Sequence, residues 1–149
     1  MYRLVRVSGE SMSPTYRPSD LLLATAPGHA GVRRGDVVVF RHGGLRMIKR
    51  AVGVAGDVVE LEAGRLFVNG EPVDGRPRLA GAYTQTWGVP RASLFVAGDH
   101  PAVSDDSRVW TEPFVAVEAI EAVVVPWLRG RRDARFSARR PAAAAAGVR

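Results

Sequence analysis

The sequence predicts a mainly β domain of antiparallel strands with few helices. Two observations support this fold class: short runs rich in valine, leucine and isoleucine recur along the chain, and glycine and proline punctuate them at close intervals. The length of 149 residues and the composition, 46% hydrophobic and 24% charged, suit one globular domain with a core of its own. Collagen-like, coiled-coil and wholly disordered chains are therefore excluded.

The expected strands follow one another through most of the chain. The first four are short apolar runs, at residues 2–7, 20–25, 36–41 and 45–54. A small meander follows, in which Ala63-Gly64 and Asn69-Gly70 supply tight turns between strands at 57–62, 65–68 and 71–73. Residues 74–91 are rich in glycine, proline and polar side chains, which predicts a long loop. The last two strands are expected at 93–97 and 114–125, although the composition of 116–125 also fits a helix.

The positive charge of the chain is concentrated at its end. Residues 129–149 carry seven arginines and one aspartate, which accounts for the whole net charge of +6. We therefore expect one domain over residues 1–128 and an Arg/Ala-rich tail over 129–149, either a solvated disordered terminus or a patch for anionic lipid or nucleic acid. Residues 1–128 carry no net charge, which argues against a dedicated nucleic-acid binder. The sequence does not indicate an oligomeric state.

Several kinds of site are excluded by composition. The chain has no cysteine, which rules out disulfides, thiolate catalysis and iron–sulfur ligation. Its three histidines, His29, His42 and His100, are scattered, so we expect neither a metal site nor a cofactor. No apolar stretch approaches the roughly 18 to 20 residues of a spanning helix, and no signal peptide is evident, so a soluble, uncleaved chain is expected.

One lysine and one serine-rich turn suggest nucleophilic catalysis. Every basic residue except Lys49 is arginine. Arginine cannot give up its proton, whereas a buried lysine can become a neutral general base. Residues 8–15 place three serines around Gly9 and Pro14, in a turn that can present the Ser11 hydroxyl as a nucleophile. Taken alone, each feature has a simpler interpretation. Lys49 could be a lysine retained by chance, and residues 8–15 could be an ordinary serine-rich turn.

At this point the chain resembles the type I signal peptidases, the Ser/Lys endopeptidases that release exported proteins. Four blocks in order carry the resemblance: Gly9-x-Ser11-Met12-x-Pro14-Thr15, Gly35-Asp36-Val37-Val38, Lys49-Arg50-x-Val52-Gly53-x-x-Gly56-Asp57, and Gly98-Asp99 followed by Ser104-x-Asp106-Ser107-Arg108-x-Trp110. The family implies the β fold shared by signal peptidases and self-cleaving SOS-type repressors, antiparallel sheets with a β-hairpin insertion.

The resemblance implies a role for each of six residues. Ser11 would be the nucleophile and Lys49 the general base, with Ser104 orienting the lysine amine. Asp106 and Arg108 would form a supporting ion pair beneath the site, and Met12 would line the substrate groove. Three alternatives stay open: Ser104 as an ordinary turn serine, Asp106 and Arg108 as an exposed pair of little consequence, and Met12 as a core residue.

The chain departs from the family pattern at three places. Gly9 stands where many members carry an oxyanion-hole serine, so the second donor is unidentified, with Ser8 and Ser13 as candidates. His100-Pro101 replaces the usual Asn-Arg, and Thr111 replaces a glycine, so a buttressing ion pair is lost or replaced. Family members also begin with membrane-spanning segments, which this sequence does not show. This difference has three interpretations. The anchor has been removed, or the protein is a naturally soluble relative, or it reaches the membrane only through a peripheral contact.

The expected activity is that of a serine endopeptidase. It would cleave signal peptides from exported precursors after an Ala-x-Ala-like site, at the extracytoplasmic face of a membrane, without a cofactor. A soluble or cytoplasmic peptidase dedicated to the maturation of one precursor is an alternative. A self-cleaving repressor-type domain is another, although no DNA-binding helix-turn-helix and no linker precede Ser11.

Overall fold

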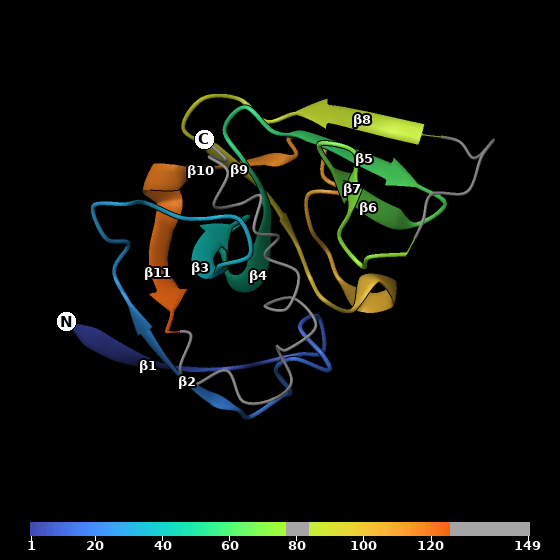
Figure 1. Ribbon diagram of the computed structural model, residues 1–149. Coiled ribbons are helices and arrows are strands. Elements are labelled where there is room, and N and C mark those ends of the chain that lie inside the picture. Colours follow the sequence, from blue (N-terminus) through green and yellow to red (C-terminus); the bar gives the residue numbers. More distant parts are fainter. Residues whose placement is uncertain (77–83, 126–149) are drawn as a thin grey trace.

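The computed structural model describes residues 1–76 and 84–125, and within them the chain is built almost wholly from β-strands. This confirms the predicted fold class. The strands form two antiparallel sheets (Figure 1). The larger sheet has seven strands in the order β1-β2-β11-β3-β4-β9-β10, and the smaller has four in the order β7-β6-β5-β8. The predicted tail, residues 129–149, lies outside the described residues.

The bounds of the strands agree closely with the apolar runs. The larger sheet contains β1 (Tyr2–Arg6), β2 (Leu21–Thr25), β3 (Val37–His42), β4 (Leu45–Val54), β9 (Ser93–Ala97), β10 (Phe114–Ala116) and β11 (Ile120–Val124). The smaller sheet contains β5 (Val58–Glu62), β6 (Arg65–Val68), β7 (Glu71–Pro72) and β8 (Thr84–Gly88). Two short 3₁₀ turns, Pro101–Val103 and Val117–Ala119, are the helical elements of the described ranges.

The meander turns have the predicted chemistry. Ala63 and Gly64 have φ values of 49° and 76°, and Asn69 and Gly70 have values of 51° and 82°. Two successive residues with positive φ are what a type I′ hairpin turn requires. Because this turn matches the right-handed twist of the strands, β5, β6 and β7 pair in the short meander that the sequence predicted.

Two predictions about the second half of the chain need correction. Residues 74–91 were expected to form one loop, but β8 lies within them and pairs with β5 along its whole length. Its Thr-Gln-Thr sequence shows no apolar alternation because β8 is an exposed edge strand. The predicted strand at 114–125 is also divided, since the 3₁₀ turn Val117–Ala119 separates β10 from β11 and sends them to different places in the sheet.

The core covers both faces of the larger sheet and continues into the smaller one. Val37, Val38 and Phe40 of β3 are completely buried, which explains why this strand reads as a continuous apolar run. Gly53 of β4 marks the junction of the two sheets. A Cβ there would lie 2.7 Å from Val59 Cγ2, so only glycine lets β4 approach β5 so closely.

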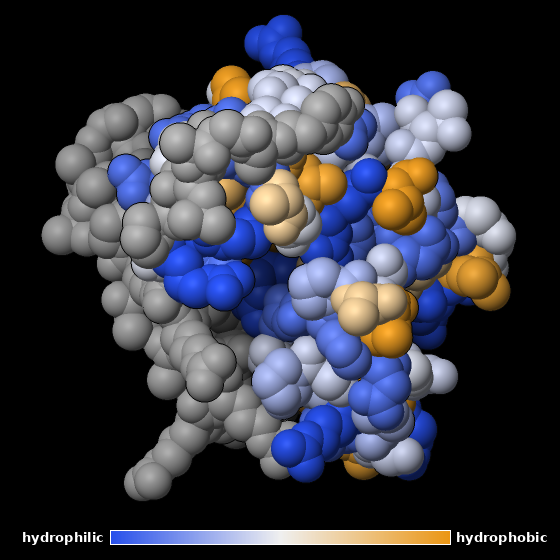
Figure 2. Space-filling view, turned by 90° about the vertical axis from the view of Figure 1, so that its right-hand side faces the viewer, coloured by the Kyte–Doolittle hydropathy of each residue, from blue (hydrophilic) through white to orange (hydrophobic). Residues whose placement is uncertain are grey.

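The exposed large hydrophobic side chains do not form one broad surface on the face that Figure 2 shows, where they stand as separate patches among hydrophilic ones. No helix within residues 1–76 and 84–125 has the length and apolar character needed to cross a membrane.

Candidate active site

The loop between β1 and β2 presents Ser11 at the edge of the larger sheet. Gly9 has a φ of 78°, which turns the chain away from β1. Backbone hydrogen bonds from Ser13 N–H to Glu10 O and from Tyr16 N–H to Met12 O, at 3.0 and 2.9 Å, close the turn on either side of Ser11. The sequence therefore folds here into a compact turn with a half-buried serine at its centre.

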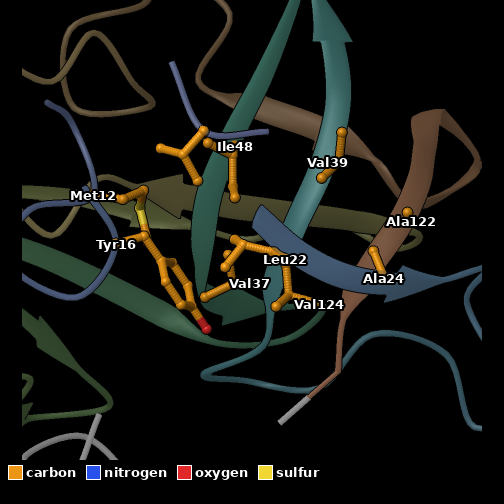
Figure 3. Packing of buried hydrophobic residues seen from close by; sticks show 10 residues of the cluster. Met12, Tyr16, Leu22, Ala24, Val37, Val39, Ile48, Ala122 and Val124 are labelled. Carbon is orange, nitrogen blue, oxygen red and sulfur yellow. The ribbon is translucent and has the colours of Figure 1, made fainter. Parts of the chain in front are cut away.

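Two apolar side chains anchor this loop in the core. Met12 is 0% exposed and belongs to the same buried cluster as Tyr16, Leu22 and Ile48 (Figure 3). The prediction that Met12 lines the substrate groove is corrected here, because a side chain without exposed surface cannot meet a peptide. Met12 is the core residue of the alternative interpretation, and it fixes the position of the adjacent Ser11.

Lys49 reaches the same point from β4. Its Nζ donates a hydrogen bond to Ser11 Oγ at 2.7 Å, and the residue is only 5% exposed. Burial lowers the pKa of Lys49, while the nearby carboxylates of Asp106 and Asp105 act in the opposite direction without cancelling the effect. The structure thus brings together the two residues that the sequence singled out, which are 38 positions apart.

Ser104 belongs to a buried network centred on Asp106. Asp106 is 0% exposed and accepts hydrogen bonds from Ser104 Oγ at 2.6 Å, from Gly98 N–H at 2.9 Å and from Arg108 Nε at 2.9 Å. Burial alone would raise the pKa of Asp106, but the bonds from Arg108, Ser104 and Gly98 together hold it below its ordinary value. The Asp106–Arg108 pair is therefore a buried ion pair rather than an exposed one.

The hydroxyl of Ser104 donates to Asp106 rather than to Lys49. Within the described residues, the hydrogen bond of the Lys49 amine is to Ser11. Ser104 is nevertheless close to Ser11, because both pack against Gly98. A Cβ on Gly98 would lie 2.2 Å from Ser104 Oγ and 2.5 Å from the carbonyl oxygen of Ser11. His100 N–H donates to that same carbonyl at 2.9 Å, so residues 98–100 form the wall behind Ser11.

A second network, which the sequence analysis missed, joins the loop between β1 and β2 to β4. Arg50 is 2% exposed and forms a bidentate ion pair with Asp99, at 2.9 and 2.6 Å. Asp99 also accepts a hydrogen bond from Thr15 Oγ1 at 2.6 Å. Arg50 follows Lys49 on the strand, so its side chain points to the other face. The three residues lie within the recognised blocks, but no sequence spacing indicates that they meet.

A groove of about 270 Å³ leads to Ser11 and Lys49. Its other described lining residues come from β1, β3, β4 and the loop between β1 and β2: Val5, Arg6, Ser8, Val39, Leu45, Arg46, Met47 and Ile48. Among the described strands, β1 pairs only with β2, and β9 pairs with β4 only from Arg50 onwards. The groove therefore lies beside two strand edges that can bind an extended peptide by backbone hydrogen bonds.

The two candidate oxyanion donors lie in different environments. Ser8 lines the groove, and its hydroxyl makes no hydrogen bond to any described residue. The Ser13 hydroxyl instead donates to Glu10 Oε2 at 2.7 Å. The backbone N–H of Ser11 also makes no hydrogen bond within the described part of the chain. No cluster of metal-ligating side chains occurs among the described residues.

Comparison with known proteins gives a consistent result. A family sequence profile described as "Signal peptidase, peptidase S26" matches residues 1–128. Signal peptidase I of Leptolyngbya laminosa is 31% identical over 119 residues, covering 70% of this chain and 58% of the relative. Signal peptidase I V of Bacillus subtilis (strain 168) is 32% identical over 123 residues, covering 69% and 73%.

The fold also resembles that of a solved structure. The crystal structure of a signal peptidase I from Enterococcus faecalis V583 superposes with a TM-score of 0.50 at 28% identity, covering 63% of this chain and 97% of that one. The chain spans 58% of the length of the relatives from Leptolyngbya laminosa and Pseudomonas fluorescens.

Proposed function

The chain belongs to the signal peptidase family, peptidase S26, and on this premise we propose that it is a serine endopeptidase that cleaves signal peptides from exported precursor proteins. The observation that carries the proposal is the 2.7 Å contact between Lys49 Nζ and Ser11 Oγ at the end of a groove. In this proposal Ser11 is the nucleophile and Lys49 the general base.

The chemistry needs a lysine that is neutral when it meets the serine. The burial that lowers the pKa of Lys49 favours the free amine. The amine then takes the proton of the Ser11 hydroxyl while Oγ attacks the scissile carbonyl carbon. Lys49, now protonated, gives this proton to the leaving amine as the C–N bond breaks. In the second half of the reaction Lys49 takes a proton from water while the water oxygen attacks the carbonyl carbon of the acyl-Ser11 ester. The bond from this carbon to Oγ then breaks, Lys49 returns the proton to Oγ, and the product leaves with a free carboxylic acid.

The tetrahedral intermediates need hydrogen-bond donors for their negative oxygen. The Ser11 N–H has no other partner in the described residues and is one donor. The exposed Ser8 hydroxyl, which faces the same groove, is the better candidate for the second, because the hydroxyl of Ser13 is engaged by Glu10. Ser104, held by Asp106 against Gly98, contributes by fixing the wall behind the dyad.

The groove also supports the proposed preference for an Ala-x-Ala-like site. A peptide lying extended beside the strand edges presents alternate side chains to the groove. The walls are formed by branched or long apolar side chains such as Val5, Met47 and Ile48, which leave room for small groups near Ser11. Signal peptidases act on exported proteins at membranes, so we place the activity at the extracytoplasmic face of a membrane, with precursor proteins as partners.

Cleavage of a precursor peptide with an Ala-x-Ala site tests the proposal. Mass spectrometry should find one cut after the second alanine, and Ser11→Ala and Lys49→Arg should each abolish it while the protein stays folded. Arginine keeps the positive charge of Lys49 but cannot act as a base. Ser13→Ala is the matched control from the same loop and should retain most of the activity. Cleavage that persists in Lys49→Arg would refute the mechanism, and equal cleavage of a peptide with leucine before the cut would refute the specificity.

A further inference from the structure

Among the described residues, every charged side chain that lines the groove is cationic. Arg6, Arg46 and Lys49 contribute to its walls, and no described aspartate or glutamate does. The two arginines, which we call the arginine rim, keep their charge at any physiological pH. Lys49 serves the chemistry, so the rim is a feature of the groove that the proposed mechanism does not use.

The rim has an excess of positive charge. Arg46 lies directly opposite Arg41 in the β3–β4 register, and both form ion pairs with the single carboxylate of Glu121, at 3.0 Å each. Two guanidinium groups thus share one acid, and the Arg46 side chain remains 55% exposed. Arg6 is exposed and forms no ion pair with any described carboxylate. An acid entering the groove therefore meets positive charge that the protein itself has not neutralised.

The position of the rim relative to the dyad fixes where such an acid would lie. Arg46 precedes Lys49 by three residues on β4, and a strand rises about 3.3 Å per residue, so the two are about 10 Å apart along the strand. This odd spacing places their side chains on opposite faces of β4, but both line the groove, which lies beside the edge of β4 that β9 leaves unpaired before Arg50. A peptide bound in the extended conformation along this edge, with its scissile bond at Ser11, has the same rise. One of its residues about three positions from the cut therefore lies beside Arg46.

We propose that the groove selects peptides that carry aspartate or glutamate at a position that the Ala-x-Ala site leaves free, either the fourth residue before the cut or the third after it, and that Arg6 and Arg46 are the residues that determine this specificity. This inference rests on the proposed peptidase function and narrows its substrate class. A peptide is the occupant that the site favours, because the arginines stand beside apolar side chains and two strand edges that suit a backbone. Guanidinium groups bind carboxylates through paired hydrogen bonds, which adds direction to the attraction.

A peptide scan tests the proposal with the full chain. Aspartate, asparagine and lysine are placed in turn at each position from five before to three after the cut of one Ala-x-Ala peptide, apart from the two alanines. We expect kcat/KM to favour aspartate over asparagine by about three- to tenfold at the fourth residue before the cut or the third after it, the effect of a partly exposed charge-assisted contact. The ratio of kcat/KM for the aspartate peptide to that for the asparagine peptide should fall towards 1 in Arg6→Gln or Arg46→Gln, and it should decrease as the salt concentration rises. In Arg46→Glu the lysine peptide should become the preferred one.

Arg3→Gln is the matched control. Arg3 is an exposed arginine on the same strand as Arg6, it does not line the groove, and its removal should leave the preference unchanged. Binding of the same peptides to Ser11→Ala, followed by fluorescence anisotropy, measures the preference even if no peptide is cut. If Ser11→Ala bound the aspartate peptides more tightly but the unmodified protein cleaved none of the peptides, the result would support the arginine rim and contradict the proposed function. Cleavage or binding that is equal for aspartate and asparagine at all positions would overturn the rim proposal alone.

A vesicle assay distinguishes a peptide from a lipid surface as the source of the acid. If Arg6→Gln and Arg46→Gln weakened binding to phosphatidylglycerol vesicles while the peptide preference was absent, the rim would be a membrane contact and the proposal would be wrong. If the protein prefers the aspartate peptides, Arg6→Gln and Arg46→Gln should lose this preference equally in the presence and in the absence of vesicles.

Discussion

Gly98 offers the most direct test of how the active site is held together. A methyl group at this position would lie 2.2 Å from Ser104 Oγ and 2.5 Å from the Ser11 carbonyl oxygen, whereas ordinary contact begins at 3.4 Å. The Ser104 side chain can rotate away, but the Ser11 oxygen is backbone and is also bonded to His100 N–H. Gly98→Ala must therefore displace Ser11 by roughly 1 Å. A displacement of this size costs on the order of 100-fold in rate.

Two other glycines supply controls for this prediction. Gly53→Ala is also crowded, at 2.7 Å from Val59 Cγ2, but its neighbours lie at the junction of the two sheets. It should lower the free energy of unfolding by about 1–3 kcal/mol, the usual cost of overpacking, and leave kcat/KM of the folded protein near that of the wild type. Gly88→Ala has no atom within 4 Å and should change neither quantity appreciably.

The assay is kcat/KM on one Ala-x-Ala peptide, with urea unfolding of each variant measured in parallel. Gly98→Ala should lose about 100-fold in kcat/KM under conditions where unfolding shows that it is fully folded. A folded Gly98→Ala protein with wild-type kcat/KM would show that the wall formed by residues 98–100 does not position Ser11. Equal losses of activity in the Gly98 and Gly53 variants would show that the effect is one of general packing.

Three further predictions concern the charged and polar groups of the site. Activity should rise with pH to a plateau, and the pH of half-maximal activity should lie below the ordinary lysine pKa of 10.5, because burial lowers the pKa of Lys49. A pH–rate profile with its half-maximal activity at or above pH 10.5 would contradict this. Ser104→Ala should reduce kcat/KM by about 10- to 100-fold without abolishing it, as for other groups that support a reacting residue, and complete loss of peptide cleavage would assign it a direct role. The pKa of Asp106 is lower in the folded protein than in the unfolded chain, so its ion pair with Arg108 stabilises the fold above about pH 4 and loses this effect as the pH falls further. Urea unfolding at pH 7 and pH 3 should therefore show a smaller fall in stability for Asp106→Asn than for the wild type, and an equal fall would contradict the assignment.

Most of the larger sheet could be predicted from the sequence because its strands are buried. The run of valines in β3 and the glycine-containing turns around β6 indicate their structure locally. β8 could not be predicted, since it is polar and exposed and exists through its pairing with β5. Whether a strand forms in such a segment depends on a partner distant in the sequence, which apolar periodicity does not report.

The site shows the same division between local and distant information. The single lysine and the serine-rich turn could be recognised separately, and the resemblance linked them. The role of Met12 could not be settled, because a methionine beside a nucleophile fits a groove or a core equally well, and only the packing around Tyr16 decides. The meeting of Thr15, Arg50 and Asp99 was out of reach for a further reason: the side of β4 that faces Asp99 depends on the curl of the whole sheet.

The network of Thr15, Arg50 and Asp99 has a consequence for the newly made chain. Thr15 and Asp99 are 84 residues apart, and Arg50 and Asp99 are 49 apart. The loop between β1 and β2 therefore acquires its position only after β9 has emerged and joined the sheet, since Asp99 follows directly from that strand. An N-terminal fragment that ends before Asp99 already contains Ser11 and Lys49 but lacks the contacts that hold this loop in place. Under the proposed mechanism, an unfinished chain would therefore carry the reactive pair without the folded site that cleavage requires.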